Sequence, residues 1–225
     1  MLNRRHIRLK ILQLLYSKKT GNIDNRSLLK QFNLSSKNFY KLIITQILLF
    51  KELFLESDRQ ILLNTKKYFK NDLSIIENLF INNDFFQNIN DSKLLYNLSQ
   101  KYSLDYWVNN KKKIQNIFNK IIESEIYNNY ANSDINDSSL KYSFVEDIYK
   151  NIIAQDDEIY SFYQECEIGW SDDFPLVNSI ILNWIIKTKI NNSITIPTKI
   201  FKDPSDKRFG KDLFSMVVKD KKSVE

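Results

Sequence analysis

The sequence predicts an all-α fold, a multi-helix bundle. Apolar residues recur at helical spacing through most of the 225 residues. The chain contains only three glycines and three prolines, so it has few of the residues that interrupt helices. A chain of this length forms one large domain or two small ones.

The first predicted helix covers residues 4–18. Ile7, Ile11, Leu14 and Leu15 form one apolar stripe, and Leu9, Leu12 and Tyr16 form a second. The remaining face carries His6, Lys10, Gln13 and Ser17. A helix that is apolar over so much of its circumference is expected to be packed on two sides. Gly21 is a suitable residue to end it.

The next elements are a short helix over 27–32 and a longer one over 36–55, for which Ser36 is the expected N-cap. Further helices are expected near 58–69, 73–82, 91–101, 105–130, 140–155, 157–167, 174–189 and 205–218, with an extended stretch at 192–197. The polar loop 131–139 is the predicted boundary between an N-terminal helical region, 1–130, and a second helical region, 140–225.

The composition favours a soluble, cytoplasmic protein. The one cysteine, Cys166, has no partner in the chain for a disulfide. The longest apolar stretch, 42–50, is too short to span a bilayer. The apolar run 11–15 is too short for a signal peptide. The net charge of +6 permits nucleic-acid binding without requiring it.

The sequence lacks the motifs of common catalytic sites. It has no glycine-rich phosphate loop, no paired-cysteine metal motif and no G-x-S-x-G elbow. Asp172 and Asp173 are the sharpest acidic pair, and a metal-assisted hydrolase at these residues is the least favoured hypothesis. The preferred interpretation is that Ser171 and the two acids cap a helix whose first turn contains Pro175. We therefore expect no enzymatic activity, no metal and no cofactor.

Arginine is concentrated at the N-terminus. The chain has 27 lysines but only six arginines, and three of these are Arg4, Arg5 and Arg8. A guanidinium group binds phosphate through two parallel hydrogen bonds and stacks on bases, which an ammonium group does not do. This concentration predicts an anion or nucleic-acid site, to which the polar stripe His6, Lys10 and Gln13 would add.

Other interpretations of the charge remain open. Arg4 and Arg5 are alternatively part of a frayed terminus, and the run 111–113 is a competing basic site that is more typical of a solvated helix face. The segment 151–173 carries seven acids and no lysine or arginine, whereas the segment from Lys199 onward is basic. Both ends of the chain are therefore candidates for RNA contact, and the acidic segment is a candidate surface for a basic protein. The alternative for the acidic segment is an ordinary solvated surface, which is the more common role of such a charge run.

Several motifs resemble those of NusB-type transcription antitermination factors. The segment 4–16 is similar to the family's arginine-rich opening helix, with Gln13, Leu15 and Tyr16 in its Gln-x-Leu-Tyr pattern. The later matches resemble the longer form of the family found in Bacteroidetes-type bacteria, which has inserted helices after the first. They are Ser124, Tyr127 and Tyr130; Ile168, Trp170, Asp172 and Asp173; Val177 and Asn178; 206–209; and 212–214.

The resemblance implies a NusB-like, all-helical RNA-binding protein without catalysis. Such proteins bind single-stranded boxA-type RNA in ribosomal RNA leader transcripts. They pair with NusE, a small-subunit ribosomal protein, within the RNA polymerase antitermination complex. Carried over to this chain, the RNA-binding role falls on Arg4, Arg5 and Arg8, with His6, Lys10 and Gln13 as weaker candidates.

Family members continue into further helices beyond the segment that matches 206–214. The resemblance therefore implies that the C-terminal bundle is incomplete in this sequence. The alternative function is a non-catalytic helical protein-interaction module that has lost RNA binding and uses its acidic 156–173 surface.

Overall fold

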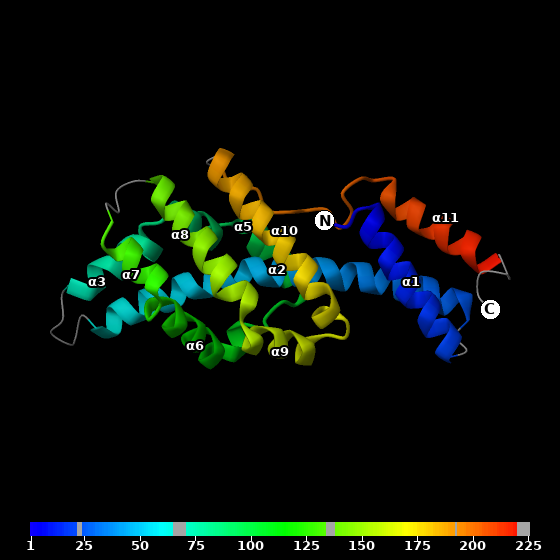
Figure 1. Ribbon diagram of the computed structural model, residues 1–225, viewed down its shortest axis with the longest axis horizontal. Helices are drawn as coiled ribbons and strands as arrows, with labels where there is room; N and C mark the ends of the chain where they lie inside the picture. Colours follow the sequence, from blue (N-terminus) through cyan, green and yellow to red (C-terminus); the bar gives the residue numbers. More distant parts are fainter. Residues whose placement is uncertain (22–23, 65–70, 134–137, 192, 220–225) are drawn as a thin grey trace. The chain divides into compact units, whose positions relative to one another are not determined.

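The regular structure is helical, as the sequence predicts. The computed structural model describes residues 1–21, 24–64, 71–133, 138–191 and 193–219 (Figure 1). Within these ranges the chain forms α-helices, short 3-10 and π turns and one isolated β-bridge, between Leu2 and Phe201. The all-α class is confirmed. None of the described helices is long and apolar enough to cross a membrane.

The chain divides into two compact units. The first contains residues 1–40 and 197–225, and the second contains residues 41–196. The predicted boundary at 131–139, of which 134–137 lie outside the described residues, falls inside the sequence range of the second unit, and the helices on either side of it pack together.

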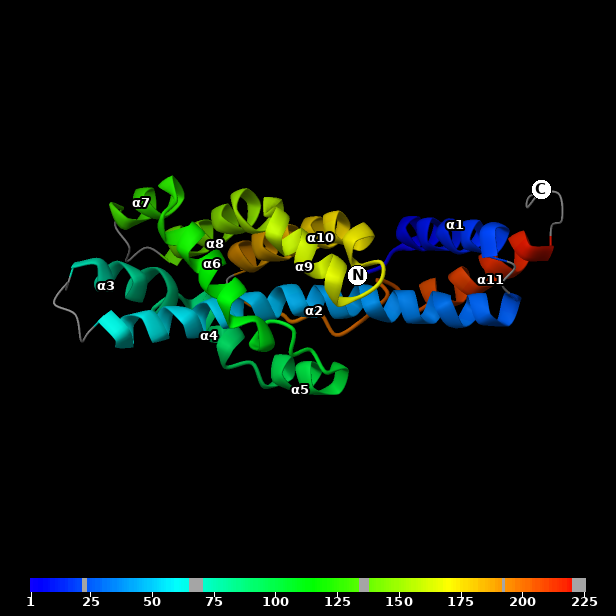
Figure 2. The same cartoon turned by 90° about the horizontal axis from the view of Figure 1, so that it is seen from below.

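The first unit brings the two ends of the chain together. It contains α1 (Arg4–Gly21), the beginning of α2 (Asn25–Asn64) and α11 (Asp206–Lys219). Helices α1 and α11 lie side by side (Figures 1 and 2). The core of this unit consists of buried apolar side chains from all three helices: Ile7, Ile11, Leu14, Leu28, Phe32, Phe39 and Phe214.

The second unit contains the rest of α2 and eight shorter helices of the described chain. These are α3 (Asn71–Ile76), α4 (Asp84–Asn90), α5 (Lys93–Tyr102), α6 (Lys111–Ile122), α7 (Glu125–Ala131), α8 (Ser138–Asn151), α9 (Asp157–Cys166) and α10 (Trp170–Asn191). A π turn, Glu77–Ile81, follows α3, and 3-10 turns occupy Val108–Asn110 and Ile153–Gln155.

Aromatic rings fill the interior of the second unit. The ring of Phe50 on α2 lies 5.1 Å from that of Phe85 in an edge-to-face arrangement, and Phe80 lies 5.2 Å from Phe118. Such pairs add about 0.5–1.5 kcal/mol each beyond the area they bury. Helix α4, which carries Phe85, is absent from the prediction and lies between the helices expected near 73–82 and 91–101.

Two predicted boundaries around α2 are wrong. The helices expected at 27–32 and 36–55 are one continuous helix of 40 residues. Ser36 is not its cap, because the buried Ser36 hydroxyl donates to the carbonyl of Phe32, 2.8 Å away. A serine inside a helix satisfies its hydroxyl by bonding one turn back.

Two further boundaries also differ. The single helix predicted over 105–130 is broken at Ser124, whose hydroxyl accepts a hydrogen bond from the amide of Tyr127 and so caps a new helix, α7. Helix α10 begins at Trp170 rather than near residue 174. Ser171 therefore lies inside its first turn rather than at the cap, and Pro175 lies beyond that turn.

Candidate nucleic-acid interface

The N-terminus is anchored ahead of α1. The amide of Leu2 donates to the carbonyl of Ile200 (2.9 Å), and the amide of Lys202 donates to the carbonyl of Leu2 (2.7 Å). The side chain of Leu2 is fully buried. The segment just before the arginines is thus held by a parallel bridge to the 200–202 segment.

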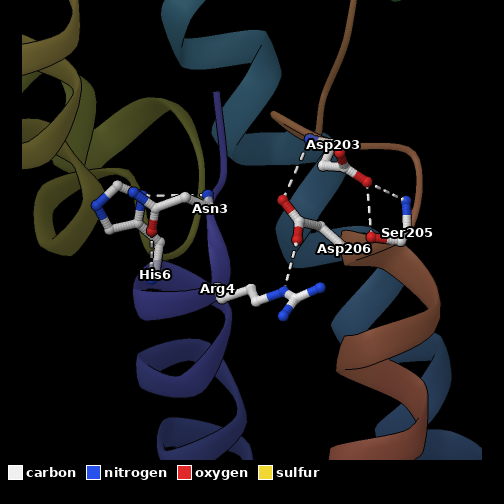
Figure 3. Close-up of polar contacts among 6 residues, drawn as sticks. All are labelled: Asn3, Arg4, His6, Asp203, Ser205 and Asp206. Atoms are coloured by element: carbon white, nitrogen blue, oxygen red, sulfur yellow. Dashed lines mark hydrogen bonds and ion pairs between the residues drawn. The ribbon is translucent and has the colours of Figure 1, made fainter.

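Asn3 and His6 form a reciprocal cap on α1 (Figure 3). The amide oxygen of Asn3 accepts from the backbone N–H of His6 (3.1 Å), and the backbone N–H of Asn3 approaches Nδ1 of His6 (3.5 Å). An N-cap of this kind satisfies an otherwise unpaired amide of the first turn. Arg4 and Arg5 therefore belong to a capped helical turn, not to a frayed end.

Arg4 is held by the beginning of α11. Its Nε lies 3.3 Å from Oδ1 of Asp206, which is buried, whereas 57% of the Arg4 side chain is exposed (Figure 3). The other carboxylate oxygen of Asp206 accepts from the backbone amide of Asp203 (3.1 Å). Asp206 thus orients Arg4 while leaving much of it at the surface.

Phe209 on α11 supports two of the three arginines. The guanidinium carbons of Arg4 and Arg8 lie 5.1 and 5.2 Å from the centre of its ring. Arg4 and Arg8 are four residues apart, so they share one face of the helix. A cation over an aromatic face gains about 0.5–1 kcal/mol at an exposed site.

The arginines keep hydrogen-bonding capacity. Arg5 and Arg8 are exposed, and neither forms a hydrogen bond or an ion pair with any residue in the described part of the chain. On α11, Lys207, Arg208 and Lys211 are exposed as well. Arg208 and Asp212 form an ion pair at 3.6 Å in which both side chains are exposed to solvent, and such pairs contribute little to stability. We call these six residues the basic surface: Arg4, Arg5, Arg8, Lys207, Arg208 and Lys211.

The sequence identified α1 but not its pairing with α11. The basic C-terminal stretch was recognised as a second candidate for RNA contact. No pattern in the sequence placed Phe209 or Asp206 beside Arg4. The only signal was the shared basic character of the two ends.

The polar stripe predicted on α1 is not one exposed surface. Lys10 is buried, its Nζ donates to the hydroxyl of Ser35 (3.0 Å), and it lies 5.3 Å from the ring centre of Phe39. His6 is half-buried and Gln13 is exposed. Lys10 therefore faces α2. The periodicity predicted that this residue faces solvent, but the packing of α1 against α2 buries it.

The environment of His6 disfavours its charged form. Burial lowers the pKa of His6, and the N-terminal amino group, Arg5 and Lys10 lower it further. A neutral ring can accept at Nδ1, which agrees with its position beside the amide of Asn3. His6 thus contributes to the start of the helix more directly than to positive charge.

The second apolar stripe of α1 is exposed, contrary to expectation. Leu9, Leu12 and Tyr16 are 52%, 64% and 71% exposed. The prediction that α1 is packed on two sides is wrong for these residues within the described structure. Periodicity shows that a face is apolar, but it does not show what covers that face.

The acidic segment 156–173 is partly neutralised inside the second unit. Lys120 pairs with Asp156 (2.7 Å) and Glu158 (3.1 Å), and Asp156 also caps α9. Glu167 accepts from Lys41 (2.9 Å) and from the hydroxyl of Tyr106 (2.8 Å). Although burial alone would raise the pKa of Glu167, these two hydrogen bonds lower it.

Asp172 and Asp173 lie in the first turn of α10, where the helix dipole favours negative charge. Among the described residues, no group of three or more His, Cys, Asp or Glu side chains is placed to hold a metal ion. In the competing basic run 111–113, Lys113 likewise lies over an aromatic ring, that of Phe162, 5.3 Å from its centre.

No protein-family model, curated protein or solved structure matches this chain.

Proposed function

We propose that this protein is a NusB-type RNA-binding adaptor that binds single-stranded, boxA-type RNA through the basic surface. In this role it acts without catalysis and joins the RNA to NusE within an RNA polymerase antitermination complex. The observation that carries the proposal is the pair of exposed guanidinium groups, Arg4 and Arg8, held over Phe209. The motif resemblance supplies the identity of the RNA and of the protein partner.

The chemistry of the basic surface suits single-stranded RNA. Guanidinium planes stack on splayed bases and hydrogen-bond to phosphates. Holding Arg4 and Arg8 against one ring reduces the conformational entropy that binding would otherwise cost. The exposed Leu12 and Tyr16 lie on the same helix, and aromatic side chains give bases a stacking platform.

The alternative, a protein-interaction module that uses the acidic segment, has weaker support. Three of its acids, Asp156, Glu158 and Glu167, already pair with lysines of the same unit. A pull-down separates the two functions, since the adaptor retains RNA together with a basic ribosomal protein and the interaction module retains protein alone.

The test is fluorescence anisotropy of a labelled boxA-type RNA against a scrambled RNA over a salt series. We expect selective binding with a log–log salt slope of about −2, as three phosphate contacts on a single strand would give. Replacing Arg4, Arg5 and Arg8 together by Ala should abolish selectivity. The matched control replaces Lys111, Lys112 and Lys113 by Ala, which removes the same charge elsewhere. Equal loss in both variants would overturn the proposed site.

A further inference from the structure

The second unit contains a groove between α2 and α5 that the proposed RNA site does not use. Its volume is about 430 Å³, which lies within the range of pockets that hold small ligands or single side chains. Figure 2 shows α5 beside α2 and separated from it, and residues of both helices and of the segment 103–108 line the groove. Leu48, Leu104 and Trp107 are buried residues that form apolar parts of its wall.

An unpaired carboxylate lies in this groove. Glu52 on α2 is half-buried, and it forms neither a hydrogen bond nor a close ion pair with any residue that the structure describes. Burial raises the pKa of Glu52, against the opposing influence of Lys51 and Lys111. A half-buried carboxylate without a partner is destabilising for the free protein, and a cation that paired with it would remove that cost.

The rest of the lining fits a guanidinium group better than an ammonium group. Gln100, Ser99 and Ser103 bring amide and hydroxyl acceptors, and Asp105 brings a second carboxylate. A guanidinium has five donors in a plane, whereas an ammonium has three. The exposed ring of Tyr96 adds an aromatic face, on which a guanidinium plane can stack.

We propose that this groove binds an arginine side chain of a basic protein partner, with the Glu52 carboxylate pairing with its guanidinium. The identity of the partner as a basic protein rests on the proposed function, which requires one. The pocket itself is independent of the RNA surface, because none of its lining residues belongs to the basic surface. Lys51 is the internal competitor of the bound arginine, since it lines the same groove.

The test uses the full chain and two peptides, acetyl-Gly-Arg-Gly-amide and its citrulline counterpart, which has the same shape without the charge. Binding is followed by the NMR shift of the indole N–H of Trp107. We expect the arginine peptide to bind with a millimolar Kd and the citrulline peptide to bind at least tenfold more weakly. Equal binding of the two peptides, or no shift with either, would overturn the proposal.

Three variants assign the effect to the groove. Glu52→Gln keeps the shape of the side chain and should weaken the binding of the arginine peptide at least tenfold. Glu123→Gln removes the same charge from an exposed site outside the groove and should leave the Kd within twofold. Lys51→Gln should tighten binding severalfold. If Glu52→Gln does not fold, the arginine and citrulline peptides on the unaltered chain still decide the outcome.

The RNA measurement is made in parallel with the Glu52→Gln variant. We expect its boxA affinity to be unchanged. Selective peptide binding without RNA binding would overturn the proposed function and retain the pocket. RNA binding without a difference between the two peptides would overturn the pocket and retain the proposed function.

Discussion

Gly210 on α11 lies directly against the ring of Phe32 on α2. A Cβ atom built on Gly210 would lie 2.6 Å from Cζ of Phe32 and 3.0 Å from Cγ2 of Ile7 on α1. Both neighbours are fully buried. The glycine therefore sets how closely α11 approaches the other two helices, and with it the position of Phe209 beneath Arg4 and Arg8.

Replacing Gly210 by Ala should destabilise the first unit. Alanine is the better helix former by about 1 kcal/mol, but overpacking a filled core costs about 1–3 kcal/mol. We expect a net loss of about 1 kcal/mol in the free energy of unfolding, measured by urea denaturation. Ser215→Ala, an exposed change on the same helix, is the control and should have little effect. In the double variant, Phe32→Leu should make room for the added methyl group, so the combined loss of stability should be smaller than the sum of the two separate losses. Strict additivity of the two losses would contradict the proposed contact.

A second prediction concerns Asn178, which links three elements of the second unit. Its Oδ1 accepts from Nε2 of Gln46 (3.1 Å) and from the hydroxyl of Tyr149 (2.9 Å), and its Nδ2 donates to the carbonyl of Ala154 (3.0 Å). Asn178→Ala would leave the fully buried Tyr149 hydroxyl without this acceptor, and an unsatisfied buried group costs about 1–3 kcal/mol. We expect the free energy of unfolding to fall by about 2–4 kcal/mol, which includes the cost of the cavity that the shorter side chain leaves.

Asn183→Ala is the control for Asn178. Asn183 is exposed on the same helix, and its one hydrogen bond among the described residues goes to the carbonyl of Ser179 in its own helix (2.7 Å). This variant should lose less than about 0.5 kcal/mol. Similar losses in the two variants would mean that the buried hydrogen bonds of Asn178 contribute little.

The sequence predicted the helical class and the approximate position of most helices, because helical periodicity reflects local geometry. The predicted helix boundaries were wrong where the same residue type occurs both at helix ends and inside helices. Ser36 serves equally as an N-cap or as a serine that bonds back inside a helix, and only the continuity of α2 decides between them. Lys10 failed for a related reason, since a long amphipathic side chain can be solvated or can lie along a buried surface.

The pairing of the two chain ends could not be predicted. Arg4 and Asp206 are 202 residues apart, and no local pattern encodes such a contact. The cluster Arg4, Arg5 and Arg8 was recognised because arginine is rare in this chain. Phe209 was not recognised as part of the same surface, since a single aromatic residue on an amphipathic helix usually belongs to the core.

Stability should rise between about pH 6 and pH 8. Burial and Lys202 lower the pKa of the Met1 amino group from 8.0 to about 6, and burial first among several causes lowers the pKa of His6 from 6.5. Over this range the unfolded chain binds more protons than the folded one, so acidification favours unfolding. We expect the free energy of unfolding to fall by roughly 1 kcal/mol on going from pH 8 to pH 6, because solvent screens the partly exposed terminus.

Urea denaturation at several pH values measures this slope. His6→Gln removes the imidazole. Below about pH 6.5 the stability of this variant should depend on pH less steeply than that of the unaltered chain, and above about pH 7 the two slopes should be the same. Acetylation of the N-terminal amine should flatten the remaining slope. Stability that decreased from pH 6 to pH 8 would contradict the lowered pKa values.

The last prediction separates the charge of the arginines from their positioning. Phe209→Leu keeps every charge of the basic surface but removes the ring that lies 5.1 and 5.2 Å from Arg4 and Arg8. The ring orders the two guanidinium groups before the RNA binds, and ordering a long side chain costs about 0.5–1.5 kcal/mol. Losing about 1 kcal/mol of this ordering in total should weaken boxA binding about fivefold. The salt slope should stay the same, because the number of neutralised phosphates is unchanged. Arg4→Ala should instead both weaken binding and make the slope shallower. A slope that changed equally in the two variants would mean that Phe209 acts on the fold of α11 rather than on the placement of the arginines.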